Sequence, residues 1–309
     1  MIISASRRTD IPAFYSEWLM NRIEVGCCGV MNPFNANQVS TVSLAPADVD
    51  VIVFWTKNAG PLLPRLADLD SLGYRYYFQY TVNGYHAPLE PGLPPLEECV
   101  STFRRLSELI GPQRVIWRYD PIIISDETPE EYHAGQFERI ASLLSGSTGR
   151  AVVSVADEYR AAKGRLDRLG IGYRQPDAGD PAFGEMIGRM AEAAGRSGME
   201  IFSCAETLDL APFGVAPGKC VDDGYIRKVF GIEVGGRKDK SQRLECGCVA
   251  SSDIGAYDTC LHGCAYCYAT RSAKTAAGNS EAHDPRSASL VGWHECEPPE
   301  GPTAQRSLF

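Results

Sequence analysis

The chain has 309 residues, of which 44% are hydrophobic, and a formal net charge of −9 at pH 7. This length can bury a full apolar core, as one large α/β barrel or two modest domains, which excludes a small domain stapled by disulfides. The acidic balance argues against a protein that coats nucleic acid, and no run approaches the roughly 18 apolar residues of a membrane span.

The predicted elements alternate along the chain between short apolar strands and longer helices. The strand candidates are residues 2–6, 49–55, 74–82, 114–119, 151–155 and 199–204. The helix candidates are residues 14–25, 60–72, 96–110, 128–144 and 183–197. This alternation is typical of βαβ units and a parallel sheet. The predicted fold class is therefore α/β, as a partial (β/α)6 TIM-type barrel with a cysteine-rich, cluster-binding extension near the C-terminus.

Composition divides the chain into three parts. We expect residues 1–210 to form the barrel and residues 211–270 to form a cysteine-rich iron–sulfur segment. Long loops of this kind are usually functional or disordered, and metal ligation would give this one order. Residues 271–309 contain few large apolar side chains, so we expect a poorly ordered tail.

The cysteine content indicates the compartment. The first residues show no basic stretch followed by a long apolar region, so we expect no signal peptide. Eleven cysteines in such a chain indicate a reducing compartment and metal binding. We therefore expect a cytoplasmic protein without a membrane partner.

Charged or hydrogen-bonding residues follow each predicted strand. Any one of them could be a helix cap or a surface ion pair. Six polar strand ends in succession instead predict a pocket at the C-terminal face of a parallel barrel. The candidates for this pocket are Arg7, Arg8, Asp10, Lys57, Gln79, Arg118, Asp120 and Glu206.

Cys260, Cys264 and Cys267 carry the strongest chemical signal. Their C-x3-C-x2-C spacing places three thiolates on one loop, where they can hold three irons of a cubane cluster. Iron–sulfur clusters normally have four cysteine ligands, so this trio predicts a cluster with one iron left open. Zinc is the alternative, because His262 could complete a set of four ligands. No second well-spaced pair follows the trio, which favours the cluster.

This loop resembles the signature of radical S-adenosylmethionine (SAM) enzymes, C-x3-C-x-aromatic-C, with Tyr266 as the aromatic residue. The resemblance implies a [4Fe-4S] cluster whose open iron binds the amino and carboxylate groups of SAM, with Tyr266 near the adenine. It also implies reductive cleavage of SAM to methionine and a 5′-deoxyadenosyl radical, which abstracts hydrogen from a substrate.

The likeness extends beyond the cysteine loop to about Ala269. The runs that carry it are Phe54-Trp-Thr-Lys57, Gln79-Tyr-Thr81, Trp117-Arg-Tyr-Asp-Pro121 and Asp253-Ile-Gly-Ala-Tyr257. They resemble an uncharacterised bacterial and archaeal family related to spore photoproduct lyase, a radical SAM enzyme that repairs a thymine dimer. Radical SAM enzymes generally carry the cysteine loop after the first barrel strand, whereas here it follows the last. In a ring of strands the last loop lies beside the first, so both positions serve the same face.

The resemblance leads us to expect a radical SAM enzyme acting on an unknown substrate that is nucleotide-like or resembles a DNA lesion. Arg7, Asp10, Lys57, Arg118 and Asp120 are the candidates for catalysis, and Tyr266, Gln79 and Glu206 for binding the cofactor. The chemistry implies a one-electron donor such as flavodoxin or ferredoxin. The alternative function is a non-catalytic protein with a structural zinc ion or iron–sulfur cluster and a small-ligand pocket.

A second cysteine set precedes the signature loop and consists of Cys204, Cys220, Cys246 and Cys248. Four such thiols fit an auxiliary iron–sulfur cluster or a structural zinc ion. The alternative is that Cys204 is simply a small buried hydrophobic residue. The remaining cysteines, Cys27, Cys28, Cys99 and Cys296, are expected to be ordinary free thiols.

Overall fold

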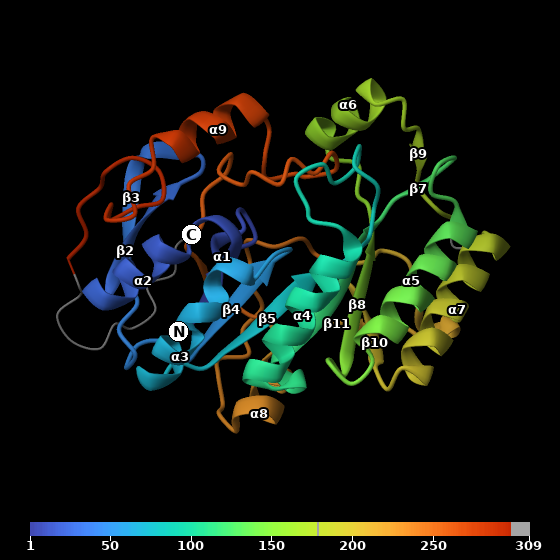
Figure 1. Ribbon diagram of the computed structural model, residues 1–309, viewed down its shortest axis with the longest axis horizontal. Coiled ribbons are helices and arrows are strands. Elements are labelled where there is room, and N and C mark those ends of the chain that lie inside the picture. Colours follow the sequence, from blue (N-terminus) through green and yellow to red (C-terminus); the bar gives the residue numbers. More distant parts are fainter. Residues whose placement is uncertain (178, 298–309) are drawn as a thin grey trace.

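A parallel sheet of eight strands forms the centre of the protein, in a computed structural model that describes residues 1–177 and 179–297 (Figure 1). The strand order is β12-β1-β4-β5-β6-β8-β10-β11, so the six longest strands lie side by side in chain order. Those six are β1 (Ile2–Ala5), β4 (Val51–Thr56), β5 (Tyr76–Thr81), β6 (Val115–Ile122), β8 (Arg150–Val155) and β10 (Glu200–Cys204). The expected α/β class with a parallel sheet is confirmed, and the sheet does not close into a barrel.

Helices cover one face of this sheet, where Phe54, Phe78 and Trp117 point into the main apolar core. The helices between the long strands are α1 (Ile11–Phe14), α2 (Ser16–Val25), α3 (Leu66–Ser71), α4 (Leu96–Ile110), α5 (Glu130–Leu144), α6 (Arg160–Arg168) and α7 (Pro181–Arg196). The predicted helix over residues 60–72 begins instead as a 3₁₀ turn, Gly60–Arg65, which contains Pro64. Proline removes a backbone donor and clashes with the preceding turn, so α3 starts only after it.

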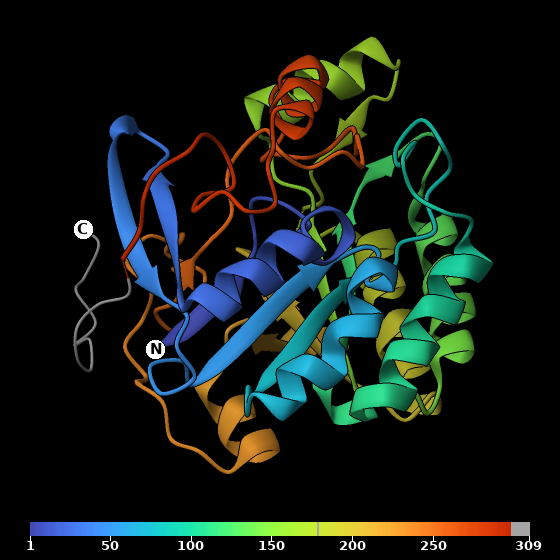
Figure 2. The same cartoon turned by 60° about the vertical axis from the view of Figure 1, so that its left-hand side comes forward.

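The opposite face of the sheet is covered by the segment that follows β11 (Ala216–Gly218). Because side chains alternate along a strand, Val53, Tyr77 and Ile116 point to this side and pack against residues such as Val221. The segment includes α8 (Asp223–Phe230) and is the orange part of the chain behind the sheet in Figure 2. The expected cysteine-rich insertion therefore lies against this opposite face, which we call the inner face of the sheet.

The short strand β12 (Ser252–Asp253) brings the far end of the chain back to its beginning. It pairs in parallel with β1, with Ile3 opposite Ser252 and Ser4 opposite Asp253. The Asp253 carboxylate accepts hydrogen bonds from the Ser6 hydroxyl at 2.7 Å and the Arg7 backbone N–H at 2.9 Å. A Cβ atom on Gly255 would lie 2.0 Å from Ser6 Oγ, so the chain needs glycine here. The cysteine loop after β12 is thereby held beside the end of β1.

The sequence prediction missed two small sheets, the helices α1, α6 and α8, and a helix in the expected tail. Strands β2 (Cys27–Asn32) and β3 (Asn35–Ser43) form an antiparallel hairpin beyond the β1 side of the main sheet. Strands β7 (Ile124–Ser125) and β9 (Tyr173–Arg174) form a second antiparallel pair. None of the helices in the described residues is long and apolar enough to cross a membrane.

The expectation of a poorly ordered tail is wrong for residues 271–297. Residues Ala273–Glu281 form α9, and the chain beyond it packs on α2 and β2. The Trp18 indole N–H donates to the Ser287 carbonyl at 3.0 Å, and the Gly29 N–H donates to the Ala288 carbonyl at 2.8 Å. The contacts that order this segment use its backbone carbonyls, so its lack of apolar side chains does not prevent packing. Residues 298–309 lie outside the described residues.

Candidate functional site

The loop that carries Cys260, Cys264 and Cys267 lies at the carboxyl edge of the sheet. Its backbone is tied to the β5–α4 loop, because the Ala265 N–H donates to the Leu89 carbonyl at 2.9 Å. Near its end, the Tyr268 hydroxyl donates to the Arg7 carbonyl at 2.7 Å. The cysteine loop thus closes over the ends of β1 and β5, where the polar strand ends also lie.

Arg165 of α6 fixes the other side of the cysteine loop. Its guanidinium donates to the carbonyls of Ala265 and Thr270, each at 2.9 Å, and to the carbonyl of Cys267. A planar guanidinium with several donors can hold three carbonyls in one geometry. The helix that supplies this clamp was not predicted, and Arg165 was therefore not a candidate.

The three signature thiols are buried or half-buried. Burial raises the pKa of the Cys260 thiol to about 12, and the negative charge of Asp10 adds to the shift. Burial also raises the pKa of Cys264, which the positive charge of Lys57 opposes. Within the described part of the chain, no hydrogen bond joins one of these three sulfurs to another.

Asp10 connects the end of β1 with β4 and the cysteine loop. Its Oδ1 accepts from the Ala13 N–H at 3.0 Å and the Thr56 hydroxyl at 2.8 Å. Its Oδ2 accepts from the Lys57 N–H at 2.7 Å and His262 Nε2 at 2.8 Å. Both oxygens already accept hydrogen bonds from the chain itself. Asp10, a predicted catalytic residue, therefore positions β4 and the cysteine loop in this structure.

Lys57 and Tyr266 meet at Glu90, which the sequence prediction missed. Lys57 Nζ lies 2.8 Å from Glu90 Oε1, and the Tyr266 hydroxyl donates to the same oxygen. The Lys57 ammonium also lies 5.4 Å from the centre of the Tyr266 ring, a cation–π distance. Burial opposes the charge of Lys57, but Glu90 and Cys264 more than offset this and raise its pKa. Two predicted residues therefore share one buried carboxylate beside the cysteine loop.

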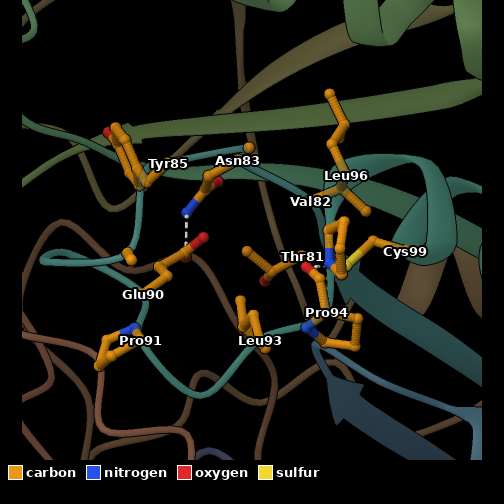
Figure 3. A pocket seen from close by; sticks show the side chains of 13 residues that line it. Thr81, Val82, Asn83, Tyr85, Glu90, Pro91, Leu93, Pro94, Leu96 and Cys99 are labelled. Atoms are coloured by element: carbon orange, nitrogen blue, oxygen red, sulfur yellow. Dashed lines mark hydrogen bonds between the residues drawn. The ribbon is translucent and has the colours of Figure 1, made fainter.

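Glu90 also borders a cavity of about 280 Å³ between the end of β5 and the start of α4 (Figure 3). The Asn83 side chain donates to Glu90 Oε1 at 3.1 Å across the rim of this cavity. Its wall contains apolar side chains, with Leu93 near Glu90 and with Val82 and Leu96 on the far side from Glu90. The volume is near the lower limit for ligand pockets, so it fits a small group or one part of a larger ligand.

Arg118, which is buried, and Asp120, which is partly buried, form an ion pair near the end of β6. Arg118 Nε lies 3.0 Å from Asp120 Oδ2, and the Ser154 hydroxyl donates to the other oxygen of Asp120. Burial opposes the charge of Asp120, but Arg118 more than offsets this and lowers its pKa. The Asp120 N–H donates to Asn83 Oδ1 at 2.8 Å, which connects this pair to the Glu90 cluster.

Arg7 and Arg118 both stack on Trp55. Their guanidinium carbons lie 5.0 Å and 5.3 Å from the centre of its ring. The Arg7 NH2 group is buried and has no partner in the described residues. Arg8, in contrast, stacks on Tyr257 at 5.4 Å. Trp55 belongs to the run Phe54-Trp-Thr-Lys57, but it was not predicted to be a site residue.

Gln79 and Glu206, predicted to bind the cofactor, do not contact Tyr266. Gln79 Nε2 donates to the Cys220 carbonyl at 2.8 Å, so it belongs to the second cysteine set. Glu206 accepts from the Val155 N–H at 2.7 Å, near the end of β8. Burial raises the pKa of Glu206 to about 8, and the charge of Asp120 adds to the shift.

The four cysteines of the second set lie together on the inner face of the sheet. Cys204 Sγ lies 2.8 Å from Cys220 Sγ, and Cys246 and Cys248 pack in the same buried cluster as Cys220. Across residues 1–177 and 179–297, however, no three histidine, cysteine, aspartate or glutamate side chains are already arranged to hold a metal ion. Contacts as short as the one between Cys204 and Cys220 leave no space for an ion between the sulfurs.

Cys27 and Cys296, expected to be ordinary free thiols, are free cysteines whose Sγ atoms lie 2.6 Å apart. This contact joins β2 to the C-terminal part of the described chain. It is remote in sequence from both cysteine sets, and spacing gave no sign of it.

Residues 2–269 match the family model described as a domain of unknown function, DUF1848. The chain belongs to this family. No curated protein and no solved structure matches the chain. The membership agrees with the expected uncharacterised family, while the relation to spore photoproduct lyase stays a prediction. The DUF1848 match ends just after the cysteine loop, so it includes both cysteine sets.

Proposed function

We propose that this DUF1848 protein is a radical SAM enzyme whose [4Fe-4S] cluster is held by Cys260, Cys264 and Cys267. The observation that carries the proposal is the position of this loop. It is braced at the carboxyl edge of a parallel sheet, where Cys264 adjoins the buried Lys57–Glu90 pair. Active sites of parallel α/β barrels are built at this edge.

Unpartnered polar atoms near the loop fit a polar group at this edge. The buried atoms Arg7 Nη2, Thr9 Oγ1 and His262 Nδ1 have no hydrogen-bond partner in the described residues. Buried polar groups are normally hydrogen-bonded, so each exception needs an explanation. A cluster with a bound amino acid and nucleoside would supply acceptors and donors to such atoms.

The chemistry supplied by the bound cluster and SAM would be reductive cleavage of SAM to generate a hydrogen-abstracting radical. The chain itself supplies charge and shape. Lys57 offsets the negative charge of a Cys264 thiolate, and Tyr266 presents its ring beside the loop. Because electrons must arrive one at a time, we propose flavodoxin or ferredoxin as the donor.

We further propose that the sheet is the open wall of a partial (β/α)6 TIM-type barrel. The six long strands follow one another in chain order, as they do in such barrels. Trp55 and the free NH2 group of Arg7 offer a stacking surface and an anion contact. They favour a substrate with an aromatic base and a phosphate, such as a nucleotide or a damaged nucleotide in DNA.

The test is anaerobic reconstitution with iron and sulfide, followed by reduction in the presence of SAM. We expect a brown protein that bleaches on reduction and releases 5′-deoxyadenosine. Cys264→Ala should lose the cluster and all cleavage, whereas Cys296→Ser, a cysteine change far from the loop, should retain both. Reductive cleavage by a variant with alanine at all three signature positions would refute the assignment. A protein that binds zinc at these positions and does not bleach would instead establish the non-catalytic alternative.

A further inference from the structure

The second cysteine set brings together sulfurs from three separate parts of the chain. Cys204 ends β10, Cys220 follows β11, and Cys246 and Cys248 come from the segment that covers the inner face of the sheet. The Sγ atoms of Cys204 and Cys220 lie 2.8 Å apart, and both residues pack in one cluster with Cys246 and Cys248. Two separate disulfide bonds would require the sulfurs only in pairs, and would not require all four cysteines to lie together.

The backbone around these sulfurs is closely packed. A Cβ atom on Gly218 would lie 2.7 Å from Phe202 Cβ, and one on Gly247 would lie 3.1 Å from Lys219 Cγ. Glycine therefore allows the three segments to approach each other. The Val221 N–H donates to Cys248 Sγ at 3.4 Å, and the Val249 N–H donates to the Val221 carbonyl at 3.0 Å. Backbone donors to a sulfur are the outer contacts that orient a metal-binding thiolate.

Positive charge surrounds the set. Arg118 Nη1 lies 2.6 Å from Cys220 Sγ, and the Arg7 guanidinium interacts electrostatically with Cys248. Both guanidinium groups stack on Trp55. Four thiolates around a divalent ion retain an excess of negative charge, and buried charge must be compensated nearby. Arg7 and Arg118 provide this compensation.

We propose that Cys204, Cys220, Cys246 and Cys248 bind one zinc ion in tetrahedral coordination. Zinc–sulfur bonds of about 2.3 Å place the sulfurs of such a site about 3.8 Å apart. The Cys204–Cys220 distance of 2.8 Å therefore needs to open by only about 1 Å. The ion fixes the segment that follows β11 against the sheet and so maintains the contacts of Arg118 and Gln79 with Cys220.

The same contacts argue against a second cubane cluster at this position. A cubane carries four irons and four sulfides between its cysteine ligands, so those sulfurs cannot touch one another. Cys220 and Cys248 lie in a packed apolar cluster with Val221, Tyr225 and Val249, so four irons and four sulfides would have to displace these side chains. The signature thiols show the contrary pattern, since no hydrogen bond joins them.

The zinc site does not depend on the SAM chemistry, and the experiment separates the two. Zinc and iron are measured by elemental analysis of full-length chain purified anaerobically. We expect one zinc per chain in the wild type and in a variant with alanine at positions 260, 264 and 267. The pair Cys246→Ser and Cys248→Ser should lose the zinc, whereas Cys296→Ser should keep it. If the protein does not cleave SAM, the expected zinc content of each variant remains the same.

A measurement on the wild type covers the case in which the double variant does not fold. A thiol-modifying reagent with a metal indicator should release one zinc per chain, and Co²⁺ added to the stripped protein should give the absorption of a tetrahedral tetrathiolate site. Iron and sulfide in place of zinc in the alanine variant would overturn the proposal in favour of a second cluster. Absence of any metal, with Cys204 and Cys220 oxidised to a disulfide, would also overturn it.

Discussion

Lys57 Nζ and Glu90 Oε1 lie 2.8 Å apart, and their side chains are only 15% and 3% exposed. This ion pair joins the end of β4 to the β5–α4 loop, and the Tyr266 hydroxyl donates to the same carboxylate oxygen. Removing one partner of a buried pair leaves the other charge without compensation, which typically costs 3–5 kcal/mol. The pair therefore contributes to stability as well as to the candidate site.

We predict that Lys57→Met lowers the free energy of unfolding by about 3 kcal/mol. Adding Glu90→Gln to this variant should recover part of the loss, because the uncompensated carboxylate is then removed. Chemical denaturation of the two variants measures both effects. The control is Arg196→Met, which breaks an exposed pair with Glu138 and should cost less than about 1 kcal/mol. Equal losses for the buried and exposed pairs would contradict the prediction.

His133 predicts a loss of stability in mild acid. Its Nε2 is 2.9 Å from the Ile123 carbonyl, which can only accept, so Nδ1 accepts from the Tyr119 hydroxyl at 2.9 Å. Burial lowers the pKa of His133 from 6.5 to about 4 in the folded protein. Between these two values the unfolded chain binds more protons, so this contribution is complete above pH 6.5 and is lost as the pH falls toward 4.

The expected loss from His133 is about 2 kcal/mol between pH 7 and pH 5. In His133→Gln, which cannot titrate, this part of the pH dependence should disappear, although the variant is less stable at pH 7. The measurement is the free energy of unfolding at both pH values. His86→Gln, at an exposed histidine, is the control and should retain the wild-type slope. A slope that is the same in all three proteins would exclude His133 as the cause.

The long strands could be predicted from the sequence because each is a short apolar run between helical stretches. The strand predicted over residues 49–55 is β4 (Val51–Thr56), and the helix predicted over residues 96–110 is α4 (Leu96–Ile110). The β2–β3 hairpin was missed because its outer strand is polar and carries few apolar residues to set a period of two. The only strong turn signal of the hairpin is Asn32-Pro33, and this pair marks irregular loops as well as hairpin turns.

The polar strand ends predicted the region of the site, but not which of its side chains touch. Arg118 and Asp120 are two residues apart on one strand and pair directly, whereas Gln79 turns toward Cys220. Glu90 was missed because it lies between Pro88 and Pro91, a composition typical of exposed turns. Its burial depends on the cysteine loop, about 170 residues later in the chain, folding over it.

Arg165 should control the mobility of the cysteine loop. Hydrogen bonds to a charged group contribute about 1.5–3 kcal/mol each, and Arg165 makes three of them to loop carbonyls. We predict that Arg165→Met increases the rate of amide hydrogen exchange in residues 264–270 at least about tenfold in protein without added iron. Arg168→Met changes an exposed arginine of the same helix and should leave these rates unchanged. No difference between the two variants would mean that the loop is held by its other contacts.

Asp10 should determine whether Cys260 and Cys264 are shielded before any cluster is bound. Asn at this position has one accepting oxygen, so Asp10→Asn must turn an NH2 group toward two of the four donors that now surround it. Unsatisfied buried groups cost about 1–3 kcal/mol, so the contact between β1, β4 and His262 is weakened by about this amount. We therefore predict that iodoacetamide alkylates Cys260 and Cys264 about tenfold faster in this variant, as measured by mass spectrometry. Asp284→Asn, in an exposed pair with Arg286, is the matched control. Unchanged alkylation in Asp10→Asn, with the protein still folded, would show that Asp10 does not brace the loop and would return it to the candidates for direct chemistry.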